Sequence, residues 1–341
     1  MPSIASSAEF LTVGTIFPQD RQNLQDSLAM QLRVRSITYL AETINGYELV
    51  DPRGRDLPRF APGTHVELRA GGFLRQYSLW NDPAERRRYC IAVLRESASR
   101  GGSRHLHEHV RAGGIVEVSH PRNSFPLDPA GERHLLIAGG IGIAPIMSMV
   151  TELRRRRAEF MVHYCTRAPQ RTAFRRELAP LAAEGSLRFH HDGGDPAQGL
   201  DIEATLREWR PGTHLYLCGP APLMAAATAA ARDWPAGTVH CEYFTGVPEP
   251  RAAEDRPFRV QLAKTGGDYE VRAGETIAEV LQRHGIAVRT SCELGYCGTC
   301  LTPYLAGEPD HRDQVLEENG RRRYVLICCS RAKTPVLVLD L

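Results

Sequence analysis

The strongest chemical signal in the chain is a group of cysteines in the segment SCELGYCGTC, residues 291–300. Three of them have the spacing C-x4-C-x2-C, and a pair of adjacent cysteines follows fewer than thirty residues later. The positions are Cys292, Cys297 and Cys300, then Cys328 and Cys329. Three thiolates on one tight loop and a fourth from a distant segment are the usual ligands of one type of [2Fe–2S] cluster. The spacing therefore predicts a one-electron carrier, with either member of the adjacent pair as the fourth ligand.

Two glycines in the same loop, Gly295 and Gly298, support this interpretation. A backbone that wraps a cluster needs residues that tolerate positive φ and close approach. Zinc is the alternative metal, but structural zinc sites usually combine paired C-x2–4-C units or histidines. The x4 interval and the single distant cysteine fit zinc poorly. Since an iron–sulfur cluster needs a source of electrons, the preceding residues should contain its donor.

Composition limits the class of protein. The 341 residues predict two or three domains, and 42 Lys+Arg against 40 Asp+Glu give a net charge of +2, which argues against nucleic acid as a partner. No apolar run is long enough to cross a membrane, and the N-terminus lacks the pattern of a secretion signal. Of nine cysteines, four are assigned to the cluster, and the others include Cys90, Cys165, Cys218 and Cys241 in strand-like settings. We therefore expect a reduced, cytoplasmic protein that binds no membrane.

The first part of the chain predicts an antiparallel β-barrel. Residues 1–27 have no periodicity and are expected to form a poorly ordered tail, whereas short alternating runs separated by turn signals fill residues 28–130. Within them, Arg75-Gln76-Tyr77-Ser78-Leu79 places a cation and an aromatic ring on one strand face. The turn Gly101-Gly102-Ser103 precedes a short predicted helix and could bind a phosphate. The two motifs together favour a flavin, although each alone could be an ordinary strand or turn.

The period changes at residues 131–246, where strands and helices alternate. HLLIAGG leads into a glycine turn and then a helix with Pro145 in its first turn, which is the arrangement of a dinucleotide site. We expect an α/β domain with a parallel sheet, whose ligands lie beyond the carboxyl ends of the strands. The candidate residues there are Gly140, Gly142, Pro145, Thr166, Arg167, Cys218, Gly219 and Pro220.

A polar, proline-containing linker is predicted at residues 247–257, followed by a small domain at residues 258–341. PFRVQLA and DYEVRAG read as a hairpin, and ETIAEVLQRHG reads as an amphipathic helix that ends at Gly285. The cluster loop and two final strands, RYVLICCS and PVLVLDL, complete the β-grasp layout of a ferredoxin domain. A domain of this size is expected to depend partly on its cluster for stability.

The motifs RQYSL, RGGS, GGIGIAP, LCGP and CELGYCGTC occur in this order. From about residue 30 onward, the chain resembles the phthalate dioxygenase reductase family, the flavin reductases of Rieske oxygenases, and vanillate demethylase reductases are close relatives. The resemblance implies electron transfer from NADH through FMN to the [2Fe–2S] cluster and on to a terminal Rieske oxygenase, in aromatic dioxygenation or demethylation, by a monomer. A stand-alone NAD(P)H:acceptor or ferredoxin reductase is the alternative within enzymes. A redox sensor, which would barely oxidise NADH, is the alternative outside them.

The resemblance also implies roles for individual residues. Ser78 would lie near the flavin N5, Cys218 near the nicotinamide ring, and Phe244 over the flavin where nicotinamide enters. The implied FMN contacts are Arg75, Tyr77, Ser78, Leu79, Gly101, Gly102 and Ser103. The family pattern C-x-S-R selects Cys328 as the fourth iron ligand, and strand alternation would allow only one of the adjacent cysteines to face the cluster. Ala144 stands where the family usually has threonine, which removes one hydroxyl contact.

Overall fold

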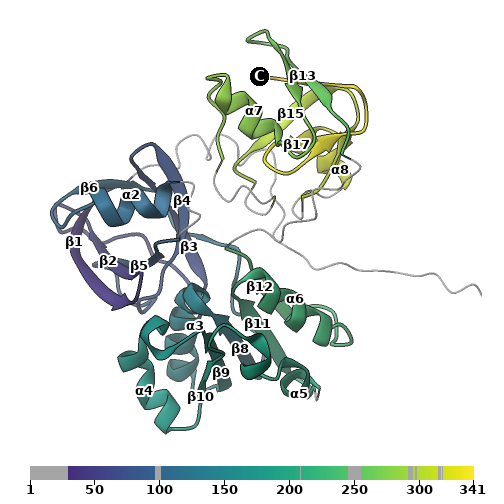
Figure 1. The fold of residues 1–341 in the computed structure, drawn as a ribbon. Helices are drawn as coiled ribbons and strands as arrows, with labels where there is room; N and C mark the ends of the chain where they lie inside the picture. The colour runs from purple at the N-terminus through teal and green to yellow at the C-terminus, as the bar shows by residue number, and fades with distance from the viewer. Residues whose placement is uncertain are drawn as a thin grey trace, which may run out of the picture. The chain divides into compact units, whose positions relative to one another are not determined.

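The computed structural model describes residues 30–96, 101–207, 209–244, 255–290, 295, 298–313, 316 and 318–341 (Figure 1). Its described residues form two compact units: Met30–Val66 with Tyr77–Phe244, and Glu67–Gln76 with the residues from 255 to 341. The hairpin Glu67–Gln76 groups with the second unit, although its strands pair within the sheet of the first. The predicted tail, residues 1–27, and most of the predicted linker lie outside the described residues.

The N-terminal domain is the predicted antiparallel barrel. Its strands are β1 (Met30–Ala41), β2 (Ile44–Val50), β3 (Thr64–Ala70), β4 (Phe73–Ser78), β5 (Tyr89–Leu94), β6 (Ile115–Val118) and β7 (Arg122–Asn123). They follow the order β4-β3-β6-β1-β2-β5, with β7 on β3. A bridge between Leu79 and Ile91 joins the end of β4 to β5, so the two edge strands of this order meet. The predicted short helix is α2 (Gly102–His109), preceded by Gly101 at φ 105°.

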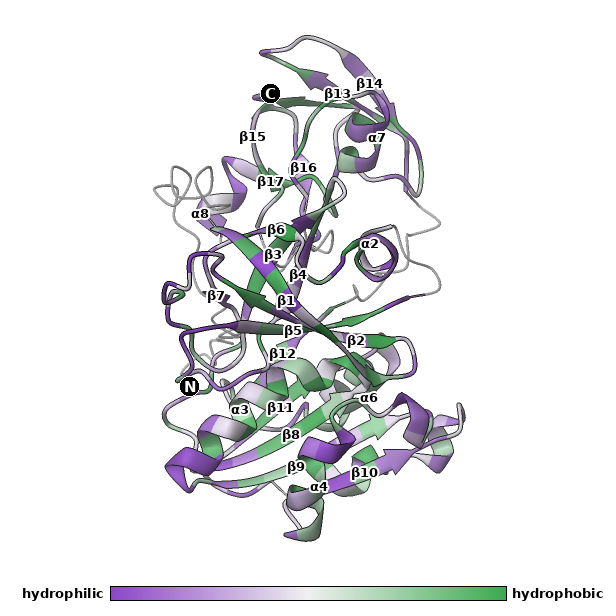
Figure 2. Ribbon diagram, turned by 90° about the vertical axis from the view of Figure 1, so that its left-hand side faces the viewer, coloured by the Kyte–Doolittle hydropathy of each residue, from purple (hydrophilic) through white to green (hydrophobic). Residues whose placement is uncertain are grey.

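The second domain is a parallel sheet of order β10-β9-β8-β11-β12. Its strands are β8 (Arg133–Gly139), β9 (Glu159–Thr166), β10 (Leu187–His191), β11 (Thr213–Cys218) and β12 (Val239–Glu242). The helices are α3 (Ile143–Arg156), α4 (Arg175–Ala183), α5 (Ile202–Leu206) and α6 (Ala221–Ala230), with 3-10 turns η1 (Gly140–Gly142), η2 (Pro169–Arg171) and η3 (Pro196–Gln198). β8 and its neighbour β11 are mainly hydrophobic along their length (Figure 2). This matches strands buried on both faces.

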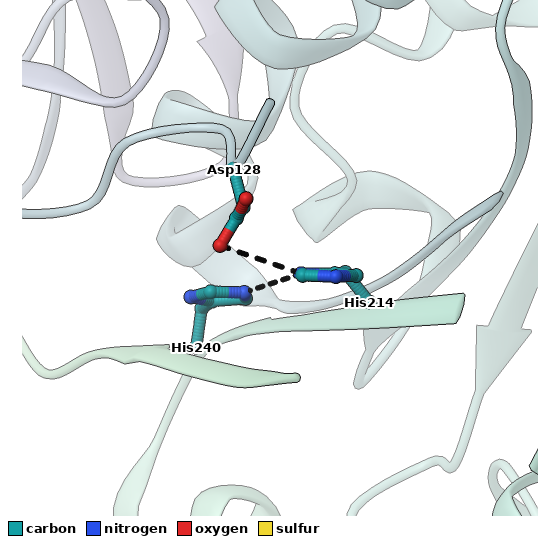
Figure 3. Close-up of side chains that lie close together, drawn as sticks. All are labelled: Asp128, His214 and His240. Atoms are coloured by element: carbon teal, nitrogen blue, oxygen red, sulfur yellow. Dashed lines mark hydrogen bonds and ion pairs between the residues drawn. The ribbon is translucent and has the colours of Figure 1, made fainter. Parts of the chain in front are cut away.

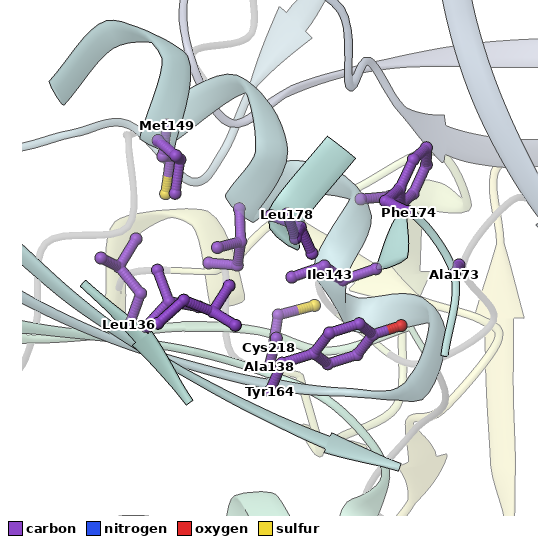
Figure 4. Packing of buried hydrophobic residues seen from close by; sticks show 14 of the residues in the cluster. Leu136, Ala138, Ile143, Met149, Tyr164, Ala173, Phe174, Leu178 and Cys218 are labelled. Atoms are coloured by element: carbon purple, nitrogen blue, oxygen red, sulfur yellow. The ribbon is translucent and has the colours of Figure 1, made fainter. Parts of the chain in front are cut away.

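Each face of this sheet has its own hydrophobic cluster. One cluster contains Leu136 and Cys218 of the sheet together with residues of α3 and α4, and the other contains Ile137 and Leu217 together with residues of α5 and α6. Figure 4 shows Cys218 beside Ala138 and Tyr164 in the first cluster. Barrel residues belong to this cluster too, namely Ala41, Ile44, Ala92 and Phe125. The barrel and the nucleotide-binding domain therefore share one core, which fixes the barrel against the sheet.

The C-terminal domain has a mixed sheet of order β14-β13-β19-β15-β17 and a two-stranded ribbon, β16-β18. The elements are β13 (Phe258–Leu262), β14 (Asp268–Val271), α7 (Ile277–Arg283), β15 (Leu301–Ala306), β16 (Pro309–Asp310), α8 (Glu318–Arg321), β17 (Tyr324–Leu326), β18 (Arg331–Ala332) and β19 (Val336–Leu339). Helix α7 begins with a capping box between Thr276 and Glu279, and Gly285 follows it at φ 77°. Among the described residues, no helix combines the length and apolar composition that crossing a membrane requires.

Candidate functional site

The glycine turn after β8 lies against the end of β11. A Cβ placed on Gly142 would stand 2.1 Å from the carbonyl oxygen of Cys218, and one on Gly139 would stand 2.5 Å from Cδ of Pro220. Only glycine fits where two backbones approach this closely. Gly140 between them has φ 53° and open space on its Cβ side. The carboxyl ends of the two strands thus form a flat, glycine-lined edge from which α3 begins, as a dinucleotide site requires.

The residues predicted after β9 differ in what they can contact. Thr166 is buried, and its Oγ1 lies 2.8 Å from Thr172 Oγ1 and 2.9 Å from Nδ1 of His191. Its hydroxyl therefore holds the loop in place. Arg167 is exposed beyond the end of β9 and can reach a ligand. Pro145, which was predicted for the same site, is buried within the first turn of α3. Of this predicted set, Arg167 has the free reach that a phosphate contact needs.

Ser78 of the barrel and Glu242 of the sheet meet at the same edge. Ser78 Oγ donates a hydrogen bond of 3.2 Å to Oε2 of Glu242. Glu242 pairs with Cys218 in the register of β11 and β12, so all three residues converge there. The sequence interpretation included Ser78 and Cys218 but missed Glu242. Its position two residues before Phe244, at the end of a strand in the α/β domain, was the available signal.

The surroundings of Glu242 and Cys218 favour the uncharged forms of both side chains. Glu242 as a whole residue is partly exposed, but its carboxyl group is buried. Desolvation raises the pKa of this group from its ordinary value near 4.5 to about 8, although the hydrogen bond from Ser78 acts in the opposite direction. Burial also raises the pKa of the Cys218 thiol well above its usual value. At pH 7, the carboxyl group is mostly protonated and the thiol is un-ionised, so neither of these two groups places a full charge beside Ser78.

The remaining flavin candidates lie on β4 and at the start of α2. Arg75 and Tyr77 are half-buried and alternate with Leu74 and Gln76 along the strand. Leu79 is fully buried and contributes to the barrel core. Gly102 is buried and Ser103 half-buried in the first turn of α2, where backbone N–H groups can bind a phosphate. Phe244 is 36% exposed, which leaves its ring free to cover a flat ligand. These residue types fit a flavin mononucleotide.

The cluster loop is described in part. Gly295 and Gly298 have φ 78° and 71°, which agrees with the need for positive φ. Cys300 and Cys328 are each 3% exposed and belong to the same hydrophobic cluster of the C-terminal domain, together with Leu326 and Ile327. Cys292 and Cys297 lie outside the described residues. Two buried thiols from the loop and from a distant segment, beside strained glycines, fit the sulfur ligands of a [2Fe–2S] cluster.

The choice between Cys328 and Cys329 needs one correction. The strand predicted over RYVLICCS ends at Leu326, so both cysteines lie in a turn and strand alternation does not separate them. They differ in environment instead. Cys328 is buried with Cys300, whereas Cys329 is half-buried and its Sγ would stand 2.7 Å from a Cβ at position 295. Cys328 stays the predicted ligand, and Cys329 lies against the loop.

Comparisons with known proteins show which domains and chains this one is similar to. A model of the 2Fe-2S iron-sulfur cluster binding domain matches residues 260–333, and one of the N-terminal domain of dimethylamine monooxygenase subunit DmmA-like proteins matches residues 118–238. The tert-butanol monooxygenase / tert-amyl alcohol desaturase reductase subunit of Aquincola tertiaricarbonis is 48% identical over 324 residues, 92% of this chain and 96% of the relative. The vanillate O-demethylase oxidoreductase of Pseudomonas sp. (strain HR199 / DSM 7063) is 43% identical over 317 residues, 92% and 100% of the two chains.

A solved structure gives the same result for the fold. Phthalate dioxygenase reductase, described as a modular structure for electron transfer from pyridine nucleotides to [2Fe-2S], superposes with a TM-score of 0.73 at 41% identity. The match covers 92% of this chain and 98% of that one. Both the order of domains and the cluster domain at the C-terminal end are therefore shared, and the chain belongs to the phthalate dioxygenase reductase family of iron–sulfur flavoprotein oxidoreductases.

Proposed function

We propose that this protein is the reductase component of a Rieske-type aromatic-ring dioxygenase or demethylase system. It takes electrons from NADH through FMN to a [2Fe–2S] cluster and delivers them to the oxygenase component. The observation that carries the proposal is the Ser78–Glu242 hydrogen bond beside Cys218, on a chain that ends in a cluster-binding domain. This bond joins the barrel and the nucleotide-binding sheet at one point, where a nicotinamide and a flavin ring would have to meet.

The cofactors are assigned to the predicted residues. FMN would be held by Arg75, Tyr77, Ser78, Leu79, Gly101, Gly102 and Ser103. NADH lies along the glycine-lined edge formed by Gly140, Gly142 and the Cys218-Gly219-Pro220 turn, with Arg167 within reach of its adenosine part. Bound FMN supplies the change between two-electron and one-electron transfer. The iron ligands are Cys292, Cys297, Cys300 and Cys328.

The chain's own residues position the two rings and control charge. Hydride transfer needs no general base, and a protonated Glu242 with an un-ionised Cys218 keeps negative charge away from the place where hydride arrives. Ser78 is 3% exposed, and its hydroxyl is fixed in orientation by its bond to Glu242. Phe244, with its exposed ring, would cover the flavin and give way to nicotinamide. The relatives are reductase subunits of oxygenase or demethylase systems, which implies an oxygenase partner. We take the working form to be a cytoplasmic monomer.

Replacing one iron ligand tests the order of the relay. Cys300→Ser removes a buried thiolate from the C-terminal domain and leaves the barrel and the nucleotide-binding sheet unchanged. We expect NADH to bleach the flavin at the wild-type rate under anaerobic conditions, while the EPR signal of the reduced cluster and oxygenase turnover are lost. The control is Cys165→Ser, which changes a half-buried cysteine of the nucleotide-binding domain. It should retain flavin reduction, the cluster signal and oxygenase turnover. Loss of flavin reduction together with the cluster signal in folded Cys300→Ser protein would contradict the relay.

A further inference from the structure

The parallel sheet carries a second cluster of polar side chains at the edge opposite the proposed nicotinamide site. Asp128 precedes β8, and His214 and His240 are the second residues of β11 and β12. Figure 3 shows the three side chains pointing toward one another. Because these residues lie at the amino ends of their strands, they take no part in the proposed electron path. Their convergence therefore needs an explanation of its own.

The spacing of their ligand atoms suits a metal ion. Nδ1 of His214 lies 2.9 Å from Nε2 of His240 and 3.9 Å from Oδ2 of Asp128. One ligand atom from each of the three residues lies within 4.8 Å of the other two. Two ligands that each stand about 2.1 Å from one ion are about 2.9–3.4 Å apart at coordination angles of about 90–110°. A hydrogen bond already holds the two nitrogens at such a separation, and an ion would take the place of its proton. The carboxylate must come closer to His214 by about 0.5 Å to join them.

The surrounding residues hold these side chains in place. Oδ1 of Asp128 accepts a hydrogen bond of 2.8 Å from the N–H of Ala130, which leaves Oδ2 toward His214. The His240 ring stacks on Tyr216 with centroids 4.6 Å apart, and the Tyr216 hydroxyl accepts a bond of 2.9 Å from the Asp128 N–H. Partners that orient the ligands in this way are typical of built metal sites. The Asp128 side chain is 34% exposed, which gives an ion a way in.

The neighbouring groups are compatible with a cation. His134, 4% exposed, has a buried Nε2 without a hydrogen-bond partner among the described residues. A Cβ at Gly131 would lie 2.9 Å from that nitrogen and 3.4 Å from Cδ2 of His214, so both rings approach the same glycine. The nearby cation, Arg156, is paired with Glu152 at 2.5 Å.

We propose that Asp128, His214 and His240 bind a divalent transition-metal ion of the Zn²⁺ class. Two imidazoles and one carboxylate are ligands that zinc accepts, with water in the open position. Bound there, the ion connects the segment before β8 to two strands that are distant from it in sequence. It acts on the stability of the nucleotide-binding domain and not on electron transfer.

The same sheet offers a matched control. Nδ1 of His163 lies 3.0 Å from Nε2 of His190, and the two rings stack with centroids 5.2 Å apart, as do those of His214 and His240. Within the part of the chain that the structure describes, this second pair has no third ligand atom grouped with it. It therefore reproduces the imidazole contact without the carboxylate, and should not hold the ion.

The test uses the holoprotein, loaded with flavin and cluster and treated with chelator. Zn²⁺ is titrated by calorimetry, and the melting temperature is followed against Zn²⁺ concentration. We expect one ion per wild-type chain and a melting temperature that rises with its concentration. Asp128→Asn and His240→Gln should each weaken binding at least about tenfold, whereas His190→Gln should bind as the wild type does.

X-ray absorption at the zinc edge identifies the ligands. The proposal predicts nitrogen and oxygen neighbours at about 2.0–2.2 Å, whereas sulfur neighbours at about 2.3 Å would place the ion on cysteines and overturn it. Absence of binding to the wild type, or undiminished binding to Asp128→Asn, would overturn it as well. Asp128→Asn is decisive if His240→Gln fails to fold, because it retains the backbone bond to Tyr216.

Discussion

Glu242 shows how one residue can connect stability and chemistry. Its carboxyl group is desolvated between β11 and the barrel and accepts a hydrogen bond from Ser78, itself a proposed flavin contact. A carboxylate in that place would be destabilised by burial, so folding favours the protonated form. Because protonation is linked to folding, the residue should make the stability of the protein depend on pH in a range where ordinary glutamates do not.

Glu242→Gln tests this linkage. The folded-state pKa of about 8 lies above the ordinary value near 4.5, so the contribution of Glu242 is complete below about pH 4.5 and is lost as the pH rises through about 8. We expect the melting temperature of the wild type to fall relative to that of the variant between pH 5 and about pH 8.5. Thermal denaturation at several pH values measures it. Exposed Glu203→Gln should follow the wild type, and parallel curves for the wild type and Glu242→Gln would refute the linkage.

At the scale of elements, the contact between η1 and the end of β11 leaves no room for a side chain on Gly142. A methyl group on Gly142 would collide with the backbone of Cys218, whereas one on Gly140 would meet nothing within 4 Å. The two glycines therefore serve different purposes: the first allows two strand ends to touch, and the second adopts φ 53°.

The pair Gly142→Ala and Gly140→Ala separates these effects. Gly142→Ala must push the ends of β8 and β11 apart and should cost about 3 kcal/mol or more of unfolding free energy. Gly140→Ala meets only the left-handed backbone penalty of about 1 kcal/mol. Urea unfolding of the holoproteins measures both. Gly142→Ala should also raise the KM for NADH, and an equal loss of stability in the two variants would show that the backbone contact is not restrictive.

The sequence predicted the elements whose signals are local. The alternating runs gave the barrel, and the strand, glycine turn and helix around Gly140 and Gly142 gave the nucleotide edge, because turn chemistry and periodicity act between near neighbours. Glu242 was missed, since its burial depends on the barrel that packs against β12. The Asp128–His214–His240 group could not be found from spacing, because its members come from the segment before β8 and from two strands that only the folded sheet places side by side. The end of β17 at Leu326 was also misjudged, since RYVLICCS reads as a continuous strand.

At the scale of the whole molecule, the two units have separate cores. The barrel and the nucleotide-binding sheet share one hydrophobic cluster, and the C-terminal domain has another around Val260 and Ile327. The C-terminal core is held at one side by Arg331, which is 4% exposed. Its guanidinium donates to the carbonyl oxygens of Arg256, Arg272 and Glu275 and forms an ion pair with Asp255. Units with separate cores should unfold in separate transitions.

Arg331→Met tests this independence. It removes the ion pair between Arg331 and the buried carboxylate of Asp255, which Arg312 also contacts, and the donors to three backbone carbonyls. A broken buried pair costs about 3–5 kcal/mol. Calorimetry of the holoprotein should show two transitions, of which only the one that releases the cluster's visible absorbance moves to lower temperature. Arg259→Met breaks the exposed pair with Asp268 in the same domain and should shift that transition little. If both transitions moved together in Arg331→Met, the two units would be thermodynamically coupled, and electron transfer would then operate within one cooperative body.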